Sequence, residues 1–135
     1  MADVQTTNQS ILVVGGGMSG ITAALEAAEA GYDVVLVEKN PYLGGRVTQL
    51  YQYFPKLCPP NCGLEINFRR MRQNSKIRFF TLAEVANISG AEGNYDVTIK
   101  LSPRYVNDKC TCCGKCSDVC EAEIENPFNF GMDKM

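Results

Sequence analysis

A glycine-rich turn near the N-terminus constrains the fold of this chain more than any other feature. An apolar run over residues 11–14 predicts a short buried strand, and Gly15, Gly17 and Gly20 follow it with the spacing G-x-G-x-x-G. Glycines at these positions permit a tight turn, a close approach of a ligand to the backbone, and close packing of a helix on the strand. The spacing therefore predicts a dinucleotide-binding turn. The alternative is a glycine-rich turn in an ordinary strand–helix–strand unit.

The residues after this turn complete such a unit. A helix is predicted over residues 19–30, ended by a glycine, and its apolar face consists of Ile21, Ala24, Leu25 and Ala28. A second buried strand is predicted over residues 34–37. Glu38 closes it, about twenty residues beyond the turn, where a carboxylate accepts hydrogen bonds from ribose hydroxyls. Because a helix N-terminus offers free N–H groups and a positive dipole end, Met18 and Ser19 join the glycines as predicted cofactor-binding residues.

A second glycine pair, Gly44 and Gly45, is followed by Arg46. These glycines permit a close backbone approach to a cofactor, and Arg46 together with Lys39 supplies positive charge near its phosphates. A plain nicotinamide-binding unit has no need of this second pair, which argues against NAD(H), the alternative cofactor. Glu38 would repel the 2′-phosphate of NADP.

Charge and composition exclude several functions. The net charge of −2 offers no electrostatic case for nucleic acid. No apolar stretch reaches the roughly 18 residues that span a membrane, and no signal pattern opens the chain, so we expect a soluble, cytoplasmic protein without direct membrane insertion. Residues 1–10 are polar and predict a flexible tail. The chain has no histidine, which removes Ser-His and Cys-His catalysis.

Seven cysteines, an odd and closely spaced set, point to metal or redox chemistry rather than a disulfide scaffold. Four of them have the spacing C-x2-C-x2-C-x3-C that binds [4Fe–4S] clusters in bacterial ferredoxins, namely Cys110, Cys113, Cys116 and Cys120. Gly114 is expected to form a tight turn around the cluster. Cys112 is extra, either a spare ligand or a buried thiol, and Glu121 stands where such runs usually have proline. Zinc is the alternative metal, and free structural thiols are the third interpretation.

In two-cluster ferredoxins the fourth cysteine of a run binds the other cluster, and only one run is present here. Cys58 and Cys62 complete the ligand set only if the fold brings them close to the run. Two prolines between them predict an extended loop rather than a helix. Their spacing alone does not decide between cluster ligands, a redox pair and loop thiols without a special role.

The middle of the chain predicts further elements. A helix over residues 63–74 would have Leu64, Ile66, Phe68 and Met71 as apolar positions. The basic residues Arg69, Arg70, Arg72, Lys76 and Arg78 form either a solvated helix face or a patch for phosphate or an acidic partner.

A third parallel strand is predicted over residues 77–80. A hairpin is expected to follow, with strands over 84–89 and 95–101 and a turn over 90–94. Alternation predicts one buried face on its second strand, consisting of Tyr95, Val97, Ile99 and Leu101. Residues 121–135 show no clear element.

The motifs together resemble a known family. GGGMSG, VEK and GGR are similar to the FAD-binding segment of glutathione-reductase-like flavoproteins. With GGRVTQLYQYFPKLCPPNC and KCTCCGKCSDVC they resemble the A subunits of heterodisulfide reductases, and closest of all the related A subunits of quinone-interacting membrane-bound oxidoreductases. The resemblance covers residues 11–120. Family members are several hundred residues long, so it implies an N-terminal portion.

This resemblance implies an α/β fold with an incomplete Rossmann-like FAD-binding domain over residues 11–105 and an incomplete ferredoxin-like segment over 106–135. The function it implies is electron transfer between a flavin and iron–sulfur clusters, in complex with other subunits, among them a membrane quinone-interacting one. The alternative of a different class is a non-catalytic, zinc-stabilised interaction module.

Overall fold

The computed structural model describes residues 10–135, which divide into two compact units. The first ends at Ser102, and the second is Pro103–Met135. This boundary lies three residues before the predicted one between residues 105 and 106. Residues 1–9 of the predicted tail lie outside the described residues, while Ser10 already belongs to the first strand.

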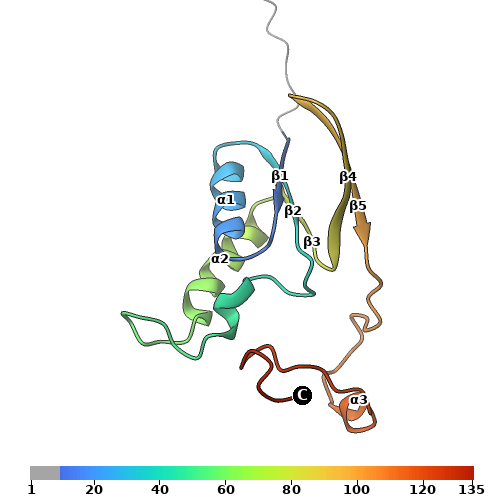
Figure 1. Cartoon of the computed structure of the whole chain (residues 1–135). Helices are drawn as coiled ribbons and strands as arrows, with labels where there is room; N and C mark the ends of the chain where they lie inside the picture. Colours follow the sequence, from blue (N-terminus) through green and yellow to red (C-terminus); the bar gives the residue numbers. More distant parts are fainter. Residues whose placement is uncertain (1–9) are drawn as a thin grey trace, which may run out of the picture. The chain divides into compact units, whose positions relative to one another are not determined.

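The first unit is built on a parallel sheet with the strand order β1–β2–β3 (Figure 1). The strands are β1 (Ser10–Val14), β2 (Asp33–Val37) and β3 (Ile77–Phe80). The helices α1 (Met18–Glu29) and α2 (Asn61–Gln73) lie together on one side of it. The crossover through α1 places the carboxyl ends of β1 and β2 side by side, which is where nucleotides bind in such sheets.

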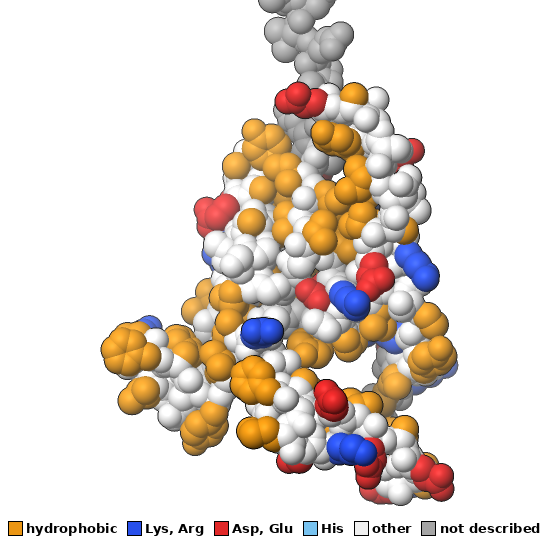
Figure 2. Space-filling view, viewed as in Figure 1, with side chains coloured by type: hydrophobic (Ala, Val, Ile, Leu, Met, Phe, Trp, Pro, Cys, Tyr) orange, Lys and Arg blue, Asp and Glu red, His pale blue; other side chains and the backbone are white. Residues whose placement is uncertain are grey.

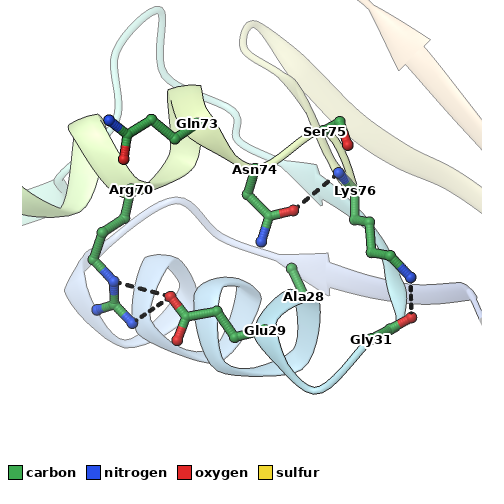
Figure 3. Close-up of a pocket in the computed structure, with 8 residues that line it drawn as sticks. All are labelled: Ala28, Glu29, Gly31, Arg70, Gln73, Asn74, Ser75 and Lys76. Carbon is green, nitrogen blue, oxygen red and sulfur yellow. Dashed lines mark hydrogen bonds and ion pairs between the residues drawn. The ribbon is translucent and has the colours of Figure 1, made fainter.

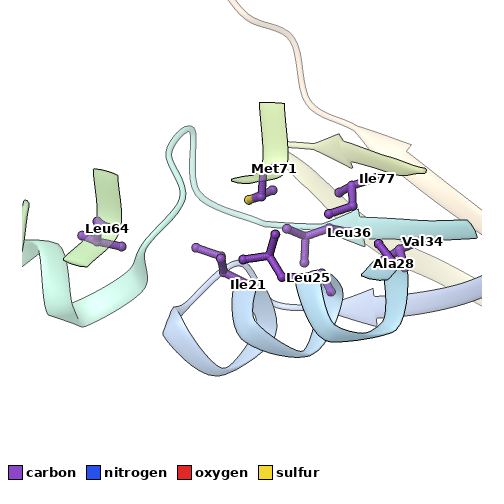
Figure 4. Packing of buried hydrophobic residues seen from close by; sticks show 9 residues of the cluster. Ile21, Leu25, Ala28, Val34, Leu36, Leu64, Met71 and Ile77 are labelled. Atoms are coloured by element: carbon purple, nitrogen blue, oxygen red, sulfur yellow. The ribbon is translucent and has the colours of Figure 1, made fainter. Parts of the chain in front are cut away.

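The core lies between this sheet and the two helices (Figure 4). The predicted apolar face of α1 is confirmed, since all four of its members are buried. The central strand β2 is buried as predicted, with Val34 and Leu36 fully inaccessible. On α2 the spacing i, i+4, i+7 brings Leu64, Phe68 and Met71 to the core. The prediction for Ile66 was wrong: it is off this stripe and is 61% exposed.

The prediction that residues 11–14 form a buried strand was also wrong. Ile11 is 37% and Val14 65% exposed. The physical reason is topology: among the described residues β1 pairs only with β2, so it lies at an edge of the sheet. A run of apolar residues indicates a strand but does not tell a central strand from an edge strand.

The hairpin of β4 (Ala83–Ala91) and β5 (Asn94–Leu101) lies on the side of the sheet away from the helices (Figure 1). Both strands extend further toward the turn than predicted, so the turn consists of two residues instead of residues 90–94. The expected buried face of β5 was wrong, because Tyr95 and Leu101 are exposed. Figure 2 shows hydrophobic side chains gathered over the sheet and hairpin. A hollow of about 730 Å³ lies between the strands β1 and β2 and the hairpin.

Helix α2 begins two residues earlier than predicted, so Cys62 lies in its first turn instead of in an extended loop. Pro60 precedes the helix with φ −64°, a value that suits a helix start, so the prolines precede α2 without disrupting it. A short 3-10 helix, Gly45–Gln49, lies between β2 and α2.

The second unit has little regular structure. It contains α3 (Lys115–Asp118) and a bridge between Glu125 and Lys134, where the sequence indicated no element. No residue of Pro103–Met135 is buried. Within residues 10–135, no helix is long and apolar enough to cross a membrane.

Candidate functional site

The glycine turn has the geometry that its spacing predicts. Gly15 ends β1 with φ +102°, a backbone conformation that favours glycine, and its N–H donates to the Val37 carbonyl at 2.7 Å. A Cβ on Gly20 would lie 1.8 Å from the Gly15 carbonyl oxygen. The turn therefore needs glycine at position 15 for its conformation and at position 20 for the contact of α1 with the strand end.

The N-terminus of α1 is open to a ligand. Gly17 is its N-cap, no side chain caps the helix, and its first turn contains no acidic residue. A Cβ on Gly17 would meet nothing within 4 Å, so there is open space beside this residue. Ser19 is exposed in the first turn, whereas the side chain of Met18 packs against the core and leaves only its backbone for binding. Free N–H groups at a helix start suit a phosphate.

Glu38 is buried at the end of β2, 7% exposed. Its Oε2 accepts a 2.5 Å hydrogen bond from the N–H of Gly16, and its Oε1 accepts one of 2.7 Å from the N–H of Asn40. The carboxylate thus holds the glycine turn against the β2 end while keeping lone pairs for a ribose hydroxyl. Sequence reasoning missed Gly16. The unbroken triplet of glycines was the signal, since a Cβ on Gly16 would lie 2.4 Å from the Leu43 side chain.

The second glycine pair packs directly on the first motif. The N–H of Gly44 donates to the Gly16 carbonyl at 2.7 Å, and Gly44 forms a parallel bridge with Gly17. A Cβ on Gly45 would lie 3.0 Å from the Gly17 Cα. Both residues have positive φ, +109° and +59°. The close approach that these glycines permit is therefore to the chain itself, and it shapes the wall beside Gly17.

The two predicted cations differ in their surroundings. Arg46 is exposed and makes no ion pair within residues 10–135. Lys39 forms a 2.9 Å salt bridge with Glu84 of β4. The hydrogen bond and charge of this pair raise the pKa of Lys39 and lower that of Glu84. Arg46 is therefore the better placed of the two to meet an anionic ligand.

Replacing Glu38 by glutamine tests its double role. The amide keeps one acceptor and turns an NH2 group toward one of the two N–H donors, so about 1–3 kcal/mol of folding free energy should be lost. We expect a lower melting temperature and about tenfold weaker FAD binding by flavin fluorescence titration. Glu92→Gln, which removes an exposed carboxylate in the hairpin turn, is the control. Equal melting and equal FAD affinity in both variants would contradict the assignment.

Two of the basic residues, Arg70 and Lys76, contact α1 or the residues that follow it. Arg70 contacts Glu29 of α1 at 2.7 Å (Figure 3). It also contacts Glu26 of the same helix at 3.4 Å, and the hydrogen bonds and charges of both carboxylates raise the pKa of Arg70. The ammonium of Lys76 donates to the Gly31 carbonyl just beyond the end of α1. These residues line a hollow of about 490 Å³ that includes no residue of the glycine turn. The salt bridges are consistent with the solvated-face interpretation.

The cysteine run is exposed throughout, and all seven cysteines are free. Gly114 makes the predicted turn, with φ +80°, before α3. The N–H of Cys112 lies 3.4 Å from the sulfur of Cys110. Hydrogen bonds from the Lys115 backbone and the Thr111 hydroxyl lower the pKa of Cys113. Nowhere in residues 10–135 do three cysteine or acidic side chains gather into a group able to hold a metal ion. Thiol side chains at this spacing are suitable ligands for an iron–sulfur cluster. In the described residues, however, they are not gathered into a binding site.

Cys58 lies in the loop before α2, and Cys62 lies in the first turn of that helix. Cys58 is half-buried and lies opposite Tyr53 in an antiparallel bridge, while Cys62 is exposed. A hydrogen bond to Cys58, its charge, burial and the charge of Cys62 all raise the pKa of Tyr53. Two residues beyond Cys62, the Leu64 side chain lies 3.3 Å from where a Cβ of Gly44 would be. Cys62 is therefore two residues away in the sequence from Leu64, whose side chain packs against Gly44 of the second glycine pair.

The sequence of this chain is similar to that of known proteins. Residues 10–76 match the family of FAD-dependent oxidoreductases. In Methanopyrus kandleri, the second iron-sulfur A subunit of CoB–CoM heterodisulfide reductase is 44% identical over 122 residues, which are 90% of this chain and 19% of that protein. The corresponding iron-sulfur A subunit of Methanocaldococcus jannaschii is 43% identical over 129 residues, covering 93% and 19%. The A subunit of a ferredoxin:CoB–CoM heterodisulfide reductase of Methanosarcina acetivorans is 42% identical over 131 residues, covering 93% and 16%.

Solved structures share the fold. L-proline dehydrogenase from P. horikoshii has a TM-score of 0.55 at 20% identity, covering 69% of this chain and 20% of that one. Thioredoxin reductase from T. acidophilum has a TM-score of 0.53 at 21% identity, covering 67% and 30%. These likenesses confirm the predicted α/β, Rossmann-like fold. By its sequence the chain belongs to the family of heterodisulfide reductase A subunits, and it spans between 16% and 19% of the length of the relatives described.

Proposed function

We propose that this chain is the FAD-binding part of the flavin subunit of a heterodisulfide-reductase-like electron-transfer complex. The observation that carries the proposal is the open N-terminus of α1 behind Gly17, next to a buried carboxylate at the adjoining strand end. That combination suits a nucleotide with a pyrophosphate and a free ribose. The match of residues 10–76 to FAD-dependent oxidoreductases favours FAD over NAD(H).

Each group of the site has a part in binding. The backbone of Gly17, Ser19 and Gly20 would receive the pyrophosphate, and Glu38 would accept from the ribose. Arg46 would supply positive charge beside the phosphates. When bound, FAD exchanges two electrons with one partner and single electrons with another, while the protein contributes binding, orientation and electrostatics.

We also propose that the cysteine run binds a [4Fe–4S] cluster. Thiolates at this spacing are the ligands of bacterial ferredoxins, and two of the relatives are called iron-sulfur subunits. A unit of this size without buried residues usually depends on a metal for a stable fold. Cys110, Cys113, Cys116 and Cys120 are the proposed ligands, and zinc held by the same residues is the competing assignment.

The partners we propose are other subunits of such a complex. The relative from Methanosarcina acetivorans is called a subunit of a ferredoxin:CoB–CoM heterodisulfide reductase. A quinone-interacting membrane protein as partner, with a link to sulfur-compound metabolism, is the finer form of this proposal and rests on the sequence resemblance. Free thiols in every cysteine suit the reducing cytoplasm.

Metal and flavin analysis of protein purified without oxygen tests both cofactors. We expect stoichiometric FAD after titration, with iron and sulfide in equal amounts. Cys113→Ser should lose at least half of the iron, whereas Cys112→Ser, the adjacent control, should keep it. Absence of FAD binding would contradict the flavin proposal, and zinc without iron would assign the run to an interaction module.

A further inference from the structure

Thr48 contacts both glycines of the second pair, and the proposed function does not yet use it. Its hydroxyl donates to the Gly45 carbonyl at 2.7 Å. A Cβ on Gly44 would overlap with its methyl group, so this methyl fills the side of Gly44 on which other residues carry a side chain. Thr48 itself is half-buried in the 3-10 helix, three residues beyond Gly45.

The glycines that Thr48 contacts are those that meet the glycine turn. The N–H of Gly44 donates to the Gly16 carbonyl at 2.7 Å. A Cβ on Gly45 would lie 3.0 Å from the Gly17 Cα, so the two backbone segments touch there. Gly17 is the N-cap of α1, beside which the pyrophosphate is proposed to lie. A side chain that fixes the second pair therefore fixes one wall of the proposed site.

The backbone of the second pair needs such support. Both glycines have positive φ, and glycine reaches these angles without strain but also leaves them easily. Threonine hydroxyls often bond to a carbonyl three or four residues earlier in a helical turn. Here the carbonyl so held belongs to Gly45, in the peptide that leads into Arg46. On its other side Gly44 is closed by Leu64 of α2, whose side chain lies 3.3 Å from where a Cβ would be.

Arg46 is the charged residue that this peptide places. It is exposed, and in the part of the chain that the structure describes its guanidinium forms no ion pair. Since no carboxylate holds this charge, its position depends on the backbone from which the side chain extends. That backbone begins at the Gly45 carbonyl, which Thr48 holds.

We propose that Thr48 is a positioning residue of the FAD site. By holding the peptide between Gly45 and Arg46 in place beside Gly17, it sets where the Arg46 charge meets the pyrophosphate. This assignment rests on the proposed flavin function and deepens it, because it gives a role to a side chain that does not itself touch the cofactor.

Two substitutions separate the hydroxyl from the methyl group. Thr48→Val removes the hydroxyl and Thr48→Ser keeps it. Loss of one hydrogen bond corresponds to a factor of roughly three to ten, so FAD should bind that much more weakly to Thr48→Val in flavin fluorescence titrations. Thr48→Ser should stay within about twofold of the wild type. Thr22→Val is the matched control, because the Thr22 hydroxyl makes a similar bond, to the Met18 carbonyl at 2.8 Å, on the exposed face of α1.

A double-mutant cycle with Arg46→Gln tests whether Thr48 acts through this charge. If it does, the double variant should bind FAD about as weakly as Arg46→Gln alone. Because salt screens an exposed charge beside a phosphate, added salt should also weaken FAD binding less in Thr48→Val than in the wild type. Losses of affinity that multiply, with an unchanged salt dependence, would overturn the assignment.

Limited proteolysis of the protein without FAD gives a readout that needs no cofactor. Trypsin cleavage after Arg46 reports opening of the turn, and cleavage after Arg72 of α2 reports unfolding of the first unit. Each rate is divided by the rate for the same variant unfolded in urea. We expect Thr48→Val to speed cleavage after Arg46 by roughly threefold to tenfold relative to Arg72, and Thr48→Ser and Thr22→Val to leave this ratio unchanged.

The outcomes distinguish the two proposals. A wild-type protein that binds no FAD would overturn the flavin function and, with it, the role of Thr48 toward the cofactor. A wild-type protein that binds FAD, together with equal acceleration of both cleavages in Thr48→Val, would overturn the assignment of Thr48 alone, because the residue would then support only the general stability of the unit.

Discussion

Gly20→Ala is expected to unfold much of the first unit and to abolish FAD binding. The new Cβ would lie 1.8 Å from the Gly15 carbonyl oxygen and 3.0 Å from its carbon, both backbone atoms that no side-chain rotation can move. Relief requires α1 to shift from the strand end, which costs about 3 kcal/mol, a large part of the stability of a small domain. The melting temperature should fall by roughly 15 °C.

Gly63→Ala is the matched control, because it makes the same substitution inside a helix. Its Cβ would meet only the Tyr53 hydroxyl, at 3.9 Å, an ordinary contact. Alanine is also the better helix former by about 1 kcal/mol, so this variant should melt at the same temperature or higher. Equal melting of the two variants by circular dichroism would show that the contact of α1 with the turn is not what the structure indicates.

Gly17→Ala is expected to separate folding from binding. Gly17 has φ −72° and ψ −178°, a conformation that any residue adopts, and its Cβ would meet nothing within 4 Å. The apoprotein should therefore melt within about 2 °C of the wild type. The methyl group would occupy the open space beside Gly17 at the start of α1, near where the pyrophosphate is proposed to lie. FAD affinity should fall about a hundredfold, equivalent to about 2.7 kcal/mol.

Flavin fluorescence titration measures this affinity, and Gly63→Ala again serves as the control because it lies away from the turn. If Gly17→Ala binds FAD as tightly as the wild type, the cofactor does not occupy the space before α1. If it also loses stability, the space is filled by the protein rather than by a ligand. The contrast between positions 17 and 20 is thus a direct test of which glycine serves the ligand and which serves the fold.

Sequence patterns predicted the elements around the site well where the signal is local. The spacing of Ile21, Ala24, Leu25 and Ala28 identified the buried face of α1 completely, because helical periodicity is a property of the backbone. The same reasoning was wrong for Ile66 and for the burial of residues 11–14. Burial of a strand depends on what lies beside it, and no local pattern contains that neighbour.

The site itself was predictable in its parts but not in its assembly. The glycine motif and Glu38 could be identified from the sequence because few other requirements explain these residue types at this spacing. Glycine is needed for a tight turn and close packing, and a carboxylate at the strand end accepts hydrogen bonds. The hydrogen bond from Gly16 to Glu38 and that from Gly44 to Gly16 join residues 22 and 28 positions apart, and only the fold brings them together. The cysteine spacing likewise predicts the donor atoms of a cluster without gathering them.

By itself, the sequence determined the parallel strand–helix–strand unit, the glycine turn and its family, since all three depend on short-range stereochemistry. The tertiary structure decided that the second glycine pair packs on the first and that Arg70 ties α2 to α1. These are contacts between segments whose separation in the chain says nothing of their separation in space. Packing and chain topology, rather than local preference, determine them.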